Sequence, residues 1–213
     1  MTTPSLTIIT LNTPEIHDYA KARNEALAKA KTEWVLFVDS DEVITQALEN
    51  EINDTLRHSF NNYDAYYLSR QVTFFNRILK YGETGNAKFI RLAKKSFGRW
   101  VHPVHEVWVG RGRVGELKNP LLHNAHPTVS SFLRKVNRYS TLEAHYRKSQ
   151  GRSSSLLKIA TYPLAKFQLN YIFKLGFLDG VPGLIMAIMM SLHSYLTWTK
   201  LYLLQQQSTP DSK

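Results

Sequence analysis

Cysteine is absent from the 213-residue sequence, and acidic residues are scarce in its C-terminal part. The lack of cysteine excludes disulfides, thiolate metal sites and cysteine nucleophiles, and it fits a reducing compartment. A secretory signal is not indicated, because residues 1–5 carry no basic side chain and the apolar stretch at residues 6–11 is short and contains threonine. We therefore expect a cytoplasmic protein.

The positive charge is concentrated in one part of the chain. The formal net charge is +10, but residues 1–126 hold 16 Lys and Arg against 14 Asp and Glu, whereas residues 127–213 hold 11 against 3. The basic excess lies in the same part as the longest apolar run, which favours an anionic membrane surface over a nucleic acid as the partner. We expect no nucleic-acid binding.

The composition indicates a folded domain with an appendage. A hydrophobic fraction of 43% excludes global disorder, and the chain is longer than a usual single domain but short for two. Near residue 127 the pattern becomes helical and basic. We therefore expect an α/β domain at residues 1–127, a basic, apolar and membrane-associating helical region at residues 128–206, and a disordered tail at residues 207–213.

Signals for strands and helices alternate in the first part. The continuous apolar run at residues 34–38 is typical of a strand covered on both faces in a parallel sheet. Residues 15–31 have helical spacing, with Thr13 suited to cap this helix and Pro14 to occupy its first position. The other predicted elements are a helix at residues 45–60 and strands at residues 6–11, 63–75, 88–92 and 100–109.

One arginine interrupts the apolar stripe of the first predicted helix. Arg23 lies in the middle of a face formed by Ile16, Tyr19, Ala20, Leu27 and Ala30. An unpaired buried charge is strongly unfavourable, so the side chain needs a partner if it points into the core. The alternative is a side chain that extends past the helix edge to solvent.

The helical region contains an uncharged stretch at residues 181–199. Its length would just span a bilayer core, but Pro182 and Gly183 weaken it as a spanning helix, so an interfacial or re-entrant segment is an equal alternative. Flanking lysines, together with Tyr195 and Trp198, suit a helix at headgroup level. A buried helix of an ordinary core also stays open. We expect peripheral or monotopic attachment to the inner face of the cell membrane.

The acidic run Asp39-Ser40-Asp41-Glu42 directly follows the strand at residues 34–38. In open α/β sheets, ligands bind beyond the carboxyl ends of the strands. Two carboxylates at this spacing can hold Mg²⁺ or Mn²⁺ and reach a ribose hydroxyl, and a diphosphate would complete the coordination. The structural alternative is an acidic turn at the start of the next helix.

Two other families use acidic loops of this kind. An EF-hand is excluded because Ile44 stands where that loop requires glycine. The phosphatase motif of haloacid dehalogenases does fit residues 38–43, with Asp39 as the nucleophile. It also needs a later acidic pair, and the aspartates after Asp64 lie outside the α/β part. This phosphatase remains a lesser alternative.

Several short motifs occur together and in a specific order. Ala-Arg-Asn-Glu-Ala-Leu at residues 22–27, followed by the strand and acidic run at residues 34–42, resembles the heart of family 2 glycosyltransferases of the lipopolysaccharide-core glucosyltransferase type. The likeness continues at residues 89–92, 104–106, 117–123 and 176–180. The resemblance implies a GT-A fold, which is a Rossmann-like mixed sheet flanked by helices.

The same resemblance implies the substrates. They are a nucleotide-diphospho-sugar donor, with UDP-hexose expected first, and a glycan or lipid-linked acceptor at the cytoplasmic face of the membrane. A divalent cation, Mg²⁺ or Mn²⁺, is implied at the acidic run. By position, Asp39 would contact the ribose or the metal, Asp41 would ligate the metal, and Arg23, Asn24 and Arg91 would belong to the donor-binding set.

An inverting transfer also needs a base for the acceptor hydroxyl. A carboxylate in a partly apolar site suits this role, and Glu106 is our candidate. His123, followed by His126, is the candidate third metal ligand. We interpret His102 and His105 as structural, because Pro103 between them breaks the helix that a zinc-protease motif requires.

The start of the chain departs from the family pattern. Thr10-Leu11-Asn12 mimics the family's first turn, but the helix with Arg23 follows at once, and the family's upstream nucleotide-binding strands have no counterpart in residues 1–33. Two functions therefore stay open. One is hexosyl transfer to a cell-envelope acceptor, and the other is a non-catalytic or partner-dependent membrane-associated module of the same fold.

Overall fold

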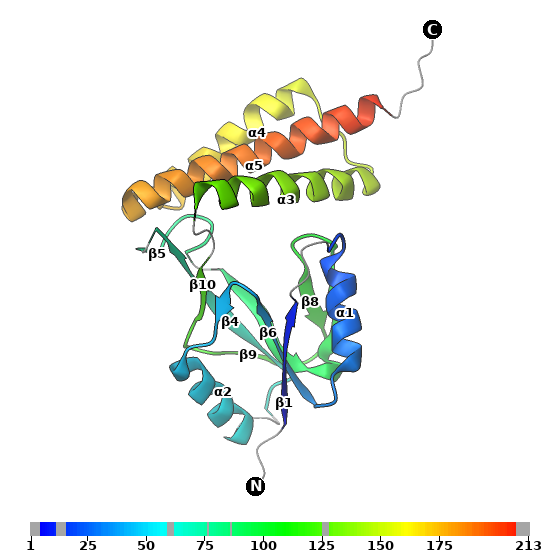
Figure 1. Ribbon diagram of the computed structural model, residues 1–213, viewed down its shortest axis with the longest axis vertical. Coiled ribbons are helices and arrows are strands. Elements are labelled where there is room, and N and C mark those ends of the chain that lie inside the picture. Colours follow the sequence, from blue (N-terminus) through cyan, green and yellow to red (C-terminus); the bar gives the residue numbers. More distant parts are fainter. Residues whose placement is uncertain are drawn as a thin grey trace. The chain divides into compact units, whose positions relative to one another are not determined.

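The computed structural model describes residues 5–11, 16–58, 62–75, 77–85, 87–124 and 128–207. Backbone contacts divide the chain into two compact units (Figure 1). The first consists of residues 1–73 and 86–125, and the second of residues 74–85 and 126–213. The first is an α/β unit and the second a helical unit. Of the predicted tail, residues 208–213 lie outside the described residues.

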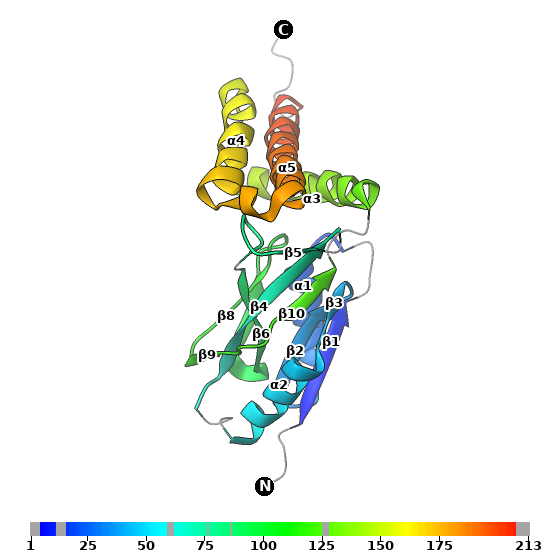
Figure 2. The same ribbon diagram turned by 90° about the vertical axis from the view of Figure 1, so that its left-hand side faces the viewer.

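A mixed sheet forms the centre of the α/β unit. Its strand order is β1-β2-β6-β4-β10-β3, and β9 pairs with β4 (Figure 2). The strands β1 and β2 are parallel, as are β4 and β10, whereas β6 is antiparallel to both β2 and β4. The bounds are β1 Leu6–Leu11, β2 Trp34–Asp39, β3 Glu42–Val43, β4 Ala65–Phe74, β6 Lys88–Lys94, β9 Val114–Glu116 and β10 Leu121–Asn124.

Two helices cover opposite faces of this sheet (Figure 2). They are α1 (Tyr19–Lys29) and α2 (Gln46–His58). Alternate residues of β2 point to the two sides: Trp34, Leu36 and Val38 pack with α2, and Val35 and Phe37 pack with α1. The prediction of a strand buried on both faces is confirmed, because these five side chains are all buried.

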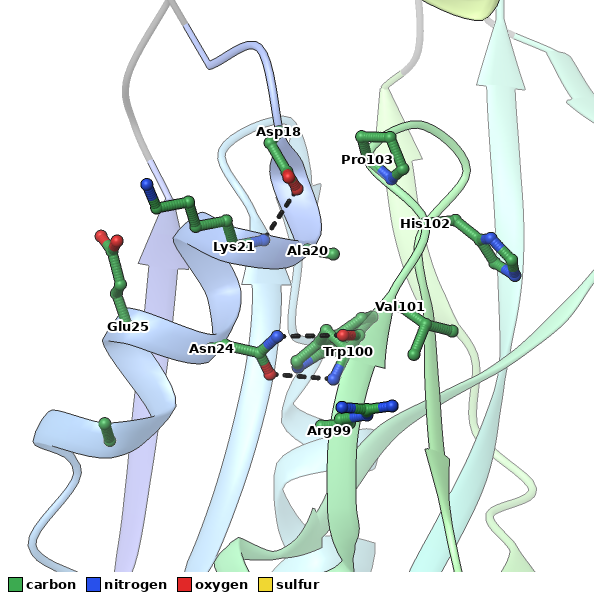
Figure 3. A pocket seen from close by; sticks show the side chains of 11 residues that line it. Asp18, Ala20, Lys21, Asn24, Glu25, Arg99, Trp100, Val101, His102 and Pro103 are labelled. Atoms are coloured by element: carbon green, nitrogen blue, oxygen red, sulfur yellow. Dashed lines mark hydrogen bonds between the residues drawn. The ribbon is translucent and has the colours of Figure 1, made fainter. Parts of the chain in front are cut away.

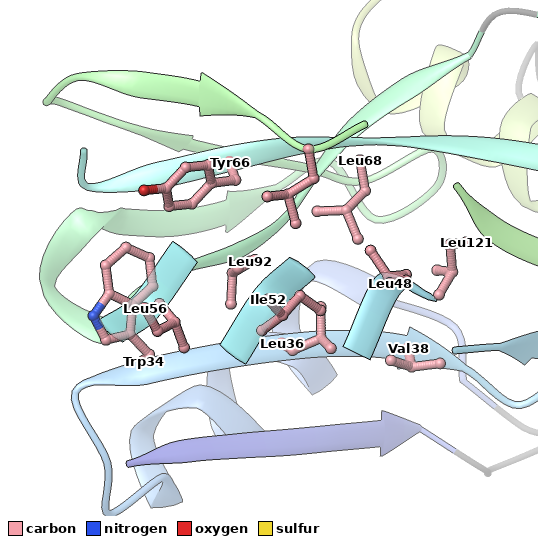
Figure 4. Packing of buried hydrophobic residues seen from close by; sticks show 11 residues of the cluster. Trp34, Leu36, Val38, Leu48, Ile52, Leu56, Tyr66, Leu68, Leu92 and Leu121 are labelled. Atoms are coloured by element: carbon pink, nitrogen blue, oxygen red, sulfur yellow. The ribbon is translucent and has the colours of Figure 1, made fainter. Parts of the chain in front are cut away.

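The face under α2 is a continuous apolar core (Figure 4). Leu48, Ile52 and Leu56 recur every four residues along α2 and are at most 2% exposed. They meet β2 and further side chains from three other strands: Tyr66, Leu68, Leu92 and Leu121. Each buried side chain of this size contributes about 1.5–3 kcal/mol, so this cluster holds the end of β2 in place.

The first two helices begin later than predicted. Helix α1 begins at Tyr19 because the side chain of Asp18 caps it, accepting a hydrogen bond from the Lys21 backbone N at 2.8 Å. The predicted caps Thr13 and Pro14 lie outside the described residues. Helix α2 begins at Gln46, where the Thr45 hydroxyl accepts a hydrogen bond from the Leu48 backbone N at 3.2 Å.

The prediction of a single strand at residues 100–109 is wrong. A short 3₁₀ turn (Lys95–Phe97) is followed by a hairpin of β7 (Gly98–Val101) and β8 (Val107–Gly110), which pair with each other in a separate two-stranded sheet. The chain reverses between them because His102 and His105 adopt left-handed backbone conformations, with φ of 70° and 54°. Pro103 between them has no N–H to offer a strand partner.

The helical unit has α5 (Gly180–Gln206) in contact with both α3 (Val129–Ser149) and α4 (Leu156–Gln168) (Figure 1). A π-helical turn (Leu169–Phe173) and a 3₁₀ turn (Gly176–Asp179) connect α4 to α5. Among the described residues, one stretch, Gly176–Gln206, is long and apolar enough to cross a membrane. However, a third of its most apolar window is buried within the protein.

Residues 74–85, including β5 (Arg77–Leu79), belong to the helical unit, whereas the sequence pattern placed them with the α/β part. Polar contacts explain this difference. The Asp179 carboxylate accepts hydrogen bonds from the backbone N atoms of Lys80 and Tyr81, at 3.1 Å and 2.9 Å. In addition, Lys166 forms an ion pair with Glu83 at 2.8 Å.

Candidate active site

Asp39 is the last residue of β2 and the centre of a charged cluster. Its Oδ1 accepts a hydrogen bond from Arg23 Nη2 at 2.5 Å, and its Oδ2 accepts one from Arg91 Nη2 at 2.8 Å. The arginines come from α1 and from β6, the strand next to β2. Both oxygens of Asp39 are therefore engaged by buried guanidinium groups.

Arg23 joins Asp39 to the hairpin loop. Its Nε donates to Glu106 Oε1 at 2.8 Å, and its side chain is only 2% exposed. The guanidinium also lies over the ring of Trp100, at 4.7 Å from the centroid. Arg23 is thus a buried, paired cation, and the alternative in which it extends past the helix edge is wrong.

Glu42 and Arg70 form a second layer of the cluster. The Glu42 side chain is fully buried, and its Oε2 accepts a hydrogen bond from the Asp39 backbone N at 2.8 Å. Arg70 Nη1 donates to Glu42 Oε1 at 3.2 Å and lies 4.0 Å from Asp39 Oδ2. Arg70 is not among the residues predicted for the site, because nothing local distinguishes an arginine in the middle of a strand.

The pKa directions follow from this arrangement. Burial alone would raise the pKa of Asp39, but Arg91, followed by Arg23 and Arg70, outweighs burial and lowers it. For Arg23, burial is again the largest cause and opposes the charge, yet Asp39 and Glu106 raise its pKa. For Arg91, burial is not fully offset by Asp39, and its pKa is lowered.

Asp41 and His123 form a separate pair beside this cluster. His123 Nε2 lies 3.3 Å from Asp41 Oδ2, and the Asn124 backbone N donates to the Asp41 carbonyl oxygen at 3.0 Å. The antiparallel pairing of β10 with β3, in which His123 faces Glu42, creates this contact. His126 lies outside the described residues.

A divalent cation fits the Asp41–His123 pair in part. The carboxylate of Asp41, which is 33% exposed, suits Mg²⁺ or Mn²⁺, whereas the imidazole of His123 is a ligand more typical of softer transition metals. Within the described residues, no group of three or more His, Asp, Glu or Cys side chains is arranged to hold a metal. Cations such as Mg²⁺ are commonly held by one or two protein ligands together with substrate phosphates, so two are sufficient.

Asn24 lies apart from Asp39 and supports the hairpin (Figure 3). Its side-chain amide donates to the Trp100 carbonyl oxygen and accepts from the Trp100 backbone N, both at 2.9 Å. These bonds fix β7 against α1, beside an open hollow of about 680 Å³ that also borders Asp18, Lys21 and Arg99. Both polar atoms of Asn24 are thus engaged by the backbone.

The structure therefore brings together most of the predicted site residues. Arg23, Asp39, Arg91 and Glu106 form one connected set, although 83 positions separate Arg23 from Glu106. Asp41 and His123 form the adjacent pair. Asn24 belongs to the support of the hairpin.

A mixed sheet with helices on both faces, and with a charged cluster at the carboxyl end of an inner strand, is consistent with the GT-A fold of glycosyltransferases. The sequence profile described as glycosyl transferase family 2 matches residues 5–139. The chain belongs to this family, and the predicted fold class is confirmed. Its membership argues against the phosphatase alternative.

Curated relatives agree with this assignment. The lipopolysaccharide core biosynthesis glycosyltransferase LpsC of Rhizobium meliloti is 27% identical over 192 residues, which cover 86% of this chain and 69% of that protein. Uncharacterized glycosyltransferases of Rickettsia typhi and Rickettsia conorii are each 23% identical over 194 residues, covering 86% of this chain and 66% and 69% of those proteins. The chain thus spans about two thirds of the length of these relatives.

Proposed function

We propose that this glycosyltransferase transfers a hexose from a nucleotide-diphospho-sugar to a cell-envelope glycan or lipid-linked acceptor. UDP-hexose is the first donor to test. The family membership and the name of the Rhizobium relative support the reaction class and the acceptor class. The basic, apolar helical unit supports a location at the cytoplasmic face of the membrane, as a peripheral or monotopic protein.

One observation carries the donor-site assignment. Arg23 and Arg91 are buried, and in each the Nη1 atom has no hydrogen-bond partner among the described residues. An unsatisfied buried N–H of a charged group is costly, so such groups call for an acceptor. The phosphate oxygens of a nucleotide sugar are suitable acceptors for guanidinium groups.

Asp41 and His123 are the proposed ligands of the metal. His123 Nδ1 is also buried without a partner in the described part of the chain, so this side chain can reorient without losing a hydrogen bond there. Asp39 is the less suited ligand, because both of its oxygens are held by arginines. A bound Mg²⁺ or Mn²⁺ would offset the charge of the departing diphosphate.

Glu106 is the proposed base. Arg23 fixes its Oε1, which orients the carboxylate, and the side chain is 13% exposed. In an inverting transfer, the acceptor oxygen bonds to the anomeric carbon while the bond from that carbon to the diphosphate breaks. Glu106 would take the proton of the acceptor hydroxyl in this step. Asn24 acts at a distance, because it positions the strand that leads into the Glu106 loop.

Calorimetry with UDP- and GDP-sugars, in the presence and absence of Mn²⁺, tests the donor site. We expect Mn²⁺-dependent binding that weakens at least tenfold in Asp41→Asn. The matched control Asp54→Asn, on the exposed face of α2, should bind within twofold of the wild type. Equal binding by wild type and Asp41→Asn would overturn the metal assignment.

A second candidate is a non-catalytic or partner-dependent module. The saturation of Asp39 by Arg23 and Arg91 favours it, because a carboxylate in that state offers no free oxygen to a ribose or a metal. This candidate predicts that a folded wild-type chain binds no nucleotide sugar under any of these conditions. The same calorimetry therefore separates the two functions.

A further inference from the structure

Helix α4 exposes apolar side chains on the face that is turned away from α5. Leu156, Leu157 and Leu164 are 70%, 72% and 66% exposed, and Phe173 in the following turn is 75% exposed. Leu157, Leu164 and Ile172 follow each other at intervals of seven and eight residues, which is two helical turns each. Together with Leu156 and Phe173, they are the exposed apolar side chains that we term the α4 surface.

The opposite face of α4 already has its partner. Pro163 is buried, and its carbonyl oxygen accepts a hydrogen bond from the Ser191 hydroxyl of α5 at 2.8 Å. Ile159 packs against the cluster of Ala144, Trp198 and Leu201. The α4 surface is therefore not needed for the core of the helical unit, and large exposed apolar patches mark interaction sites.

The charge around the α4 surface indicates its partner. Residues 144–178 contain no Asp or Glu, and their basic residues are Arg147, Lys148, Arg152, Lys158, Lys166 and Lys174. The first acidic residue beyond them, Asp179, is bonded to the Lys80 and Tyr81 backbone. Two of these cations are paired within the unit, Arg147 with Glu143 and Lys166 with Glu83. The remaining excess of positive charge beside an apolar helical face matches an anionic bilayer, where the apolar side chains enter the acyl boundary and the cations meet the headgroups.

We infer that the α4 surface is the membrane-contact surface of this protein and that it lies in the interface of an anionic bilayer. This inference rests on the membrane part of the proposed function and changes its location, because the sequence pattern pointed to residues 181–199 of α5. In the structure, α5 packs against both other long helices of the unit, and a third of its most apolar window is buried, so part of its apolar surface is already used.

The absence of cysteine allows single-site labelling of the full chain. We would attach an environment-sensitive fluorophore to Leu164→Cys and to Phe173→Cys, and to the matched exposed positions Leu133→Cys on α3 and Leu203→Cys on α5. On addition of phosphatidylglycerol-containing vesicles, the emission from positions 164 and 173 should shift to the blue, while the emission from 133 and 203 should not. A shift at 203 with none at 164 and 173 would overturn the inference in favour of α5.

Vesicle partitioning gives an independent measurement. The Leu157→Ser/Leu164→Ser variant should lose at least tenfold in partition coefficient on phosphatidylglycerol-containing vesicles, and the Val129→Ser/Leu133→Ser control on α3 should stay within twofold. Circular dichroism serves as the control that both variants keep their helices. Undiminished partitioning of the Leu157→Ser/Leu164→Ser variant contradicts the inference. So does lipid-free self-association of the wild type that this variant abolishes, because the α4 surface would then bind a second copy.

Donor binding separates this inference from the proposed reaction. The Leu157→Ser/Leu164→Ser variant should bind nucleotide sugar as the wild type does when no vesicles are present. If the wild type binds vesicles through the α4 surface but binds no donor, the transfer proposal fails and the surface remains. If it binds donor but neither labelled position responds to vesicles, the surface fails alone.

Discussion

Replacing Asp39 by asparagine tests the charged cluster most directly. The substitution keeps the size of the side chain but removes the negative charge shared by Arg23 and Arg91, whose side chains are 2% and 7% exposed. Removing one partner of a buried ion pair costs about 3–5 kcal/mol. Because Glu106 still pairs with Arg23, and Glu42 lies 3.8 Å from Arg91, we expect the lower end, about 3 kcal/mol.

Urea unfolding followed by tryptophan fluorescence measures this loss. A Trp198→Phe background leaves three tryptophans, at positions 34, 100 and 108, all in the α/β unit. With a urea dependence of about 2 kcal/mol/M, a loss of about 3 kcal/mol lowers the midpoint by about 1.5 M. Asp41→Asn is the control, because Asp41 is 33% exposed and its pair with His123 should contribute less than about 1 kcal/mol.

A double variant sharpens the test. If the loss arises from an uncompensated guanidinium, adding Arg91→Met to Asp39→Asn should restore part of the stability, because the buried charge is then removed together with its partner. The reasoning is refuted if Asp39→Asn costs no more than Asp41→Asn. It is also refuted if the double variant is less stable by the full sum of the two single losses.

Three further predictions concern pH and local hydrogen bonds. The pKa of Asp39 is lowered in the folded state, so its stabilisation is present above the unfolded pKa of about 3.9 and is lost as the pH falls towards the folded pKa. The difference in urea midpoint between wild type and Asp39→Asn should therefore shrink between pH 5 and pH 3 (about two units around that pKa) and not between pH 8 and pH 6. Asn24→Ala removes both bonds to the Trp100 backbone and should cost about 1–3 kcal/mol, read from the same unfolding curves; an unchanged midpoint would contradict this. Asp179→Ala frees the backbone N atoms of Lys80 and Tyr81, so their hydrogen exchange should accelerate at least tenfold while exchange in α2 stays constant.

The sequence predicts much of the α/β unit because its strongest signals are local. The continuous apolar run of β2 predicts a buried strand, and the four-residue spacing of Leu48, Ile52 and Leu56 predicts a helix with one buried face. The structure buries the side chains of both elements. Arg23 was recognised by the same logic, since a charge on an apolar stripe requires a partner. Its partners, Asp39 and Glu106, lie within motifs that the family resemblance had already indicated.

What the sequence could not predict depends on strand pairing. Arg70 reaches Glu42 only because β4 and β3 both pair with β10, and no local pattern encodes that order. The hairpin of β7 and β8 was missed because its reversal depends on left-handed backbone conformations at His102 and His105, and such conformations are uncommon in residues other than glycine. The exposure of α4 was missed for another reason. The sequence of an apolar helix does not reveal whether one of its faces or both are covered by neighbouring helices.

The charge balance of the cluster constrains how a donor can bind. Arg23, Arg70 and Arg91 face Asp39, Glu42 and Glu106, so the positive and negative side chains match before any ligand arrives. A nucleotide sugar brings at least one further negative charge per phosphate to this neutral set, and burying it without compensation is costly. Either an arginine exchanges a carboxylate for a phosphate, or a cation enters with the donor. Only the second route leaves the buried pairs intact, and the Asp41–His123 pair beside the cluster offers that cation a carboxylate and an imidazole 3.3 Å apart.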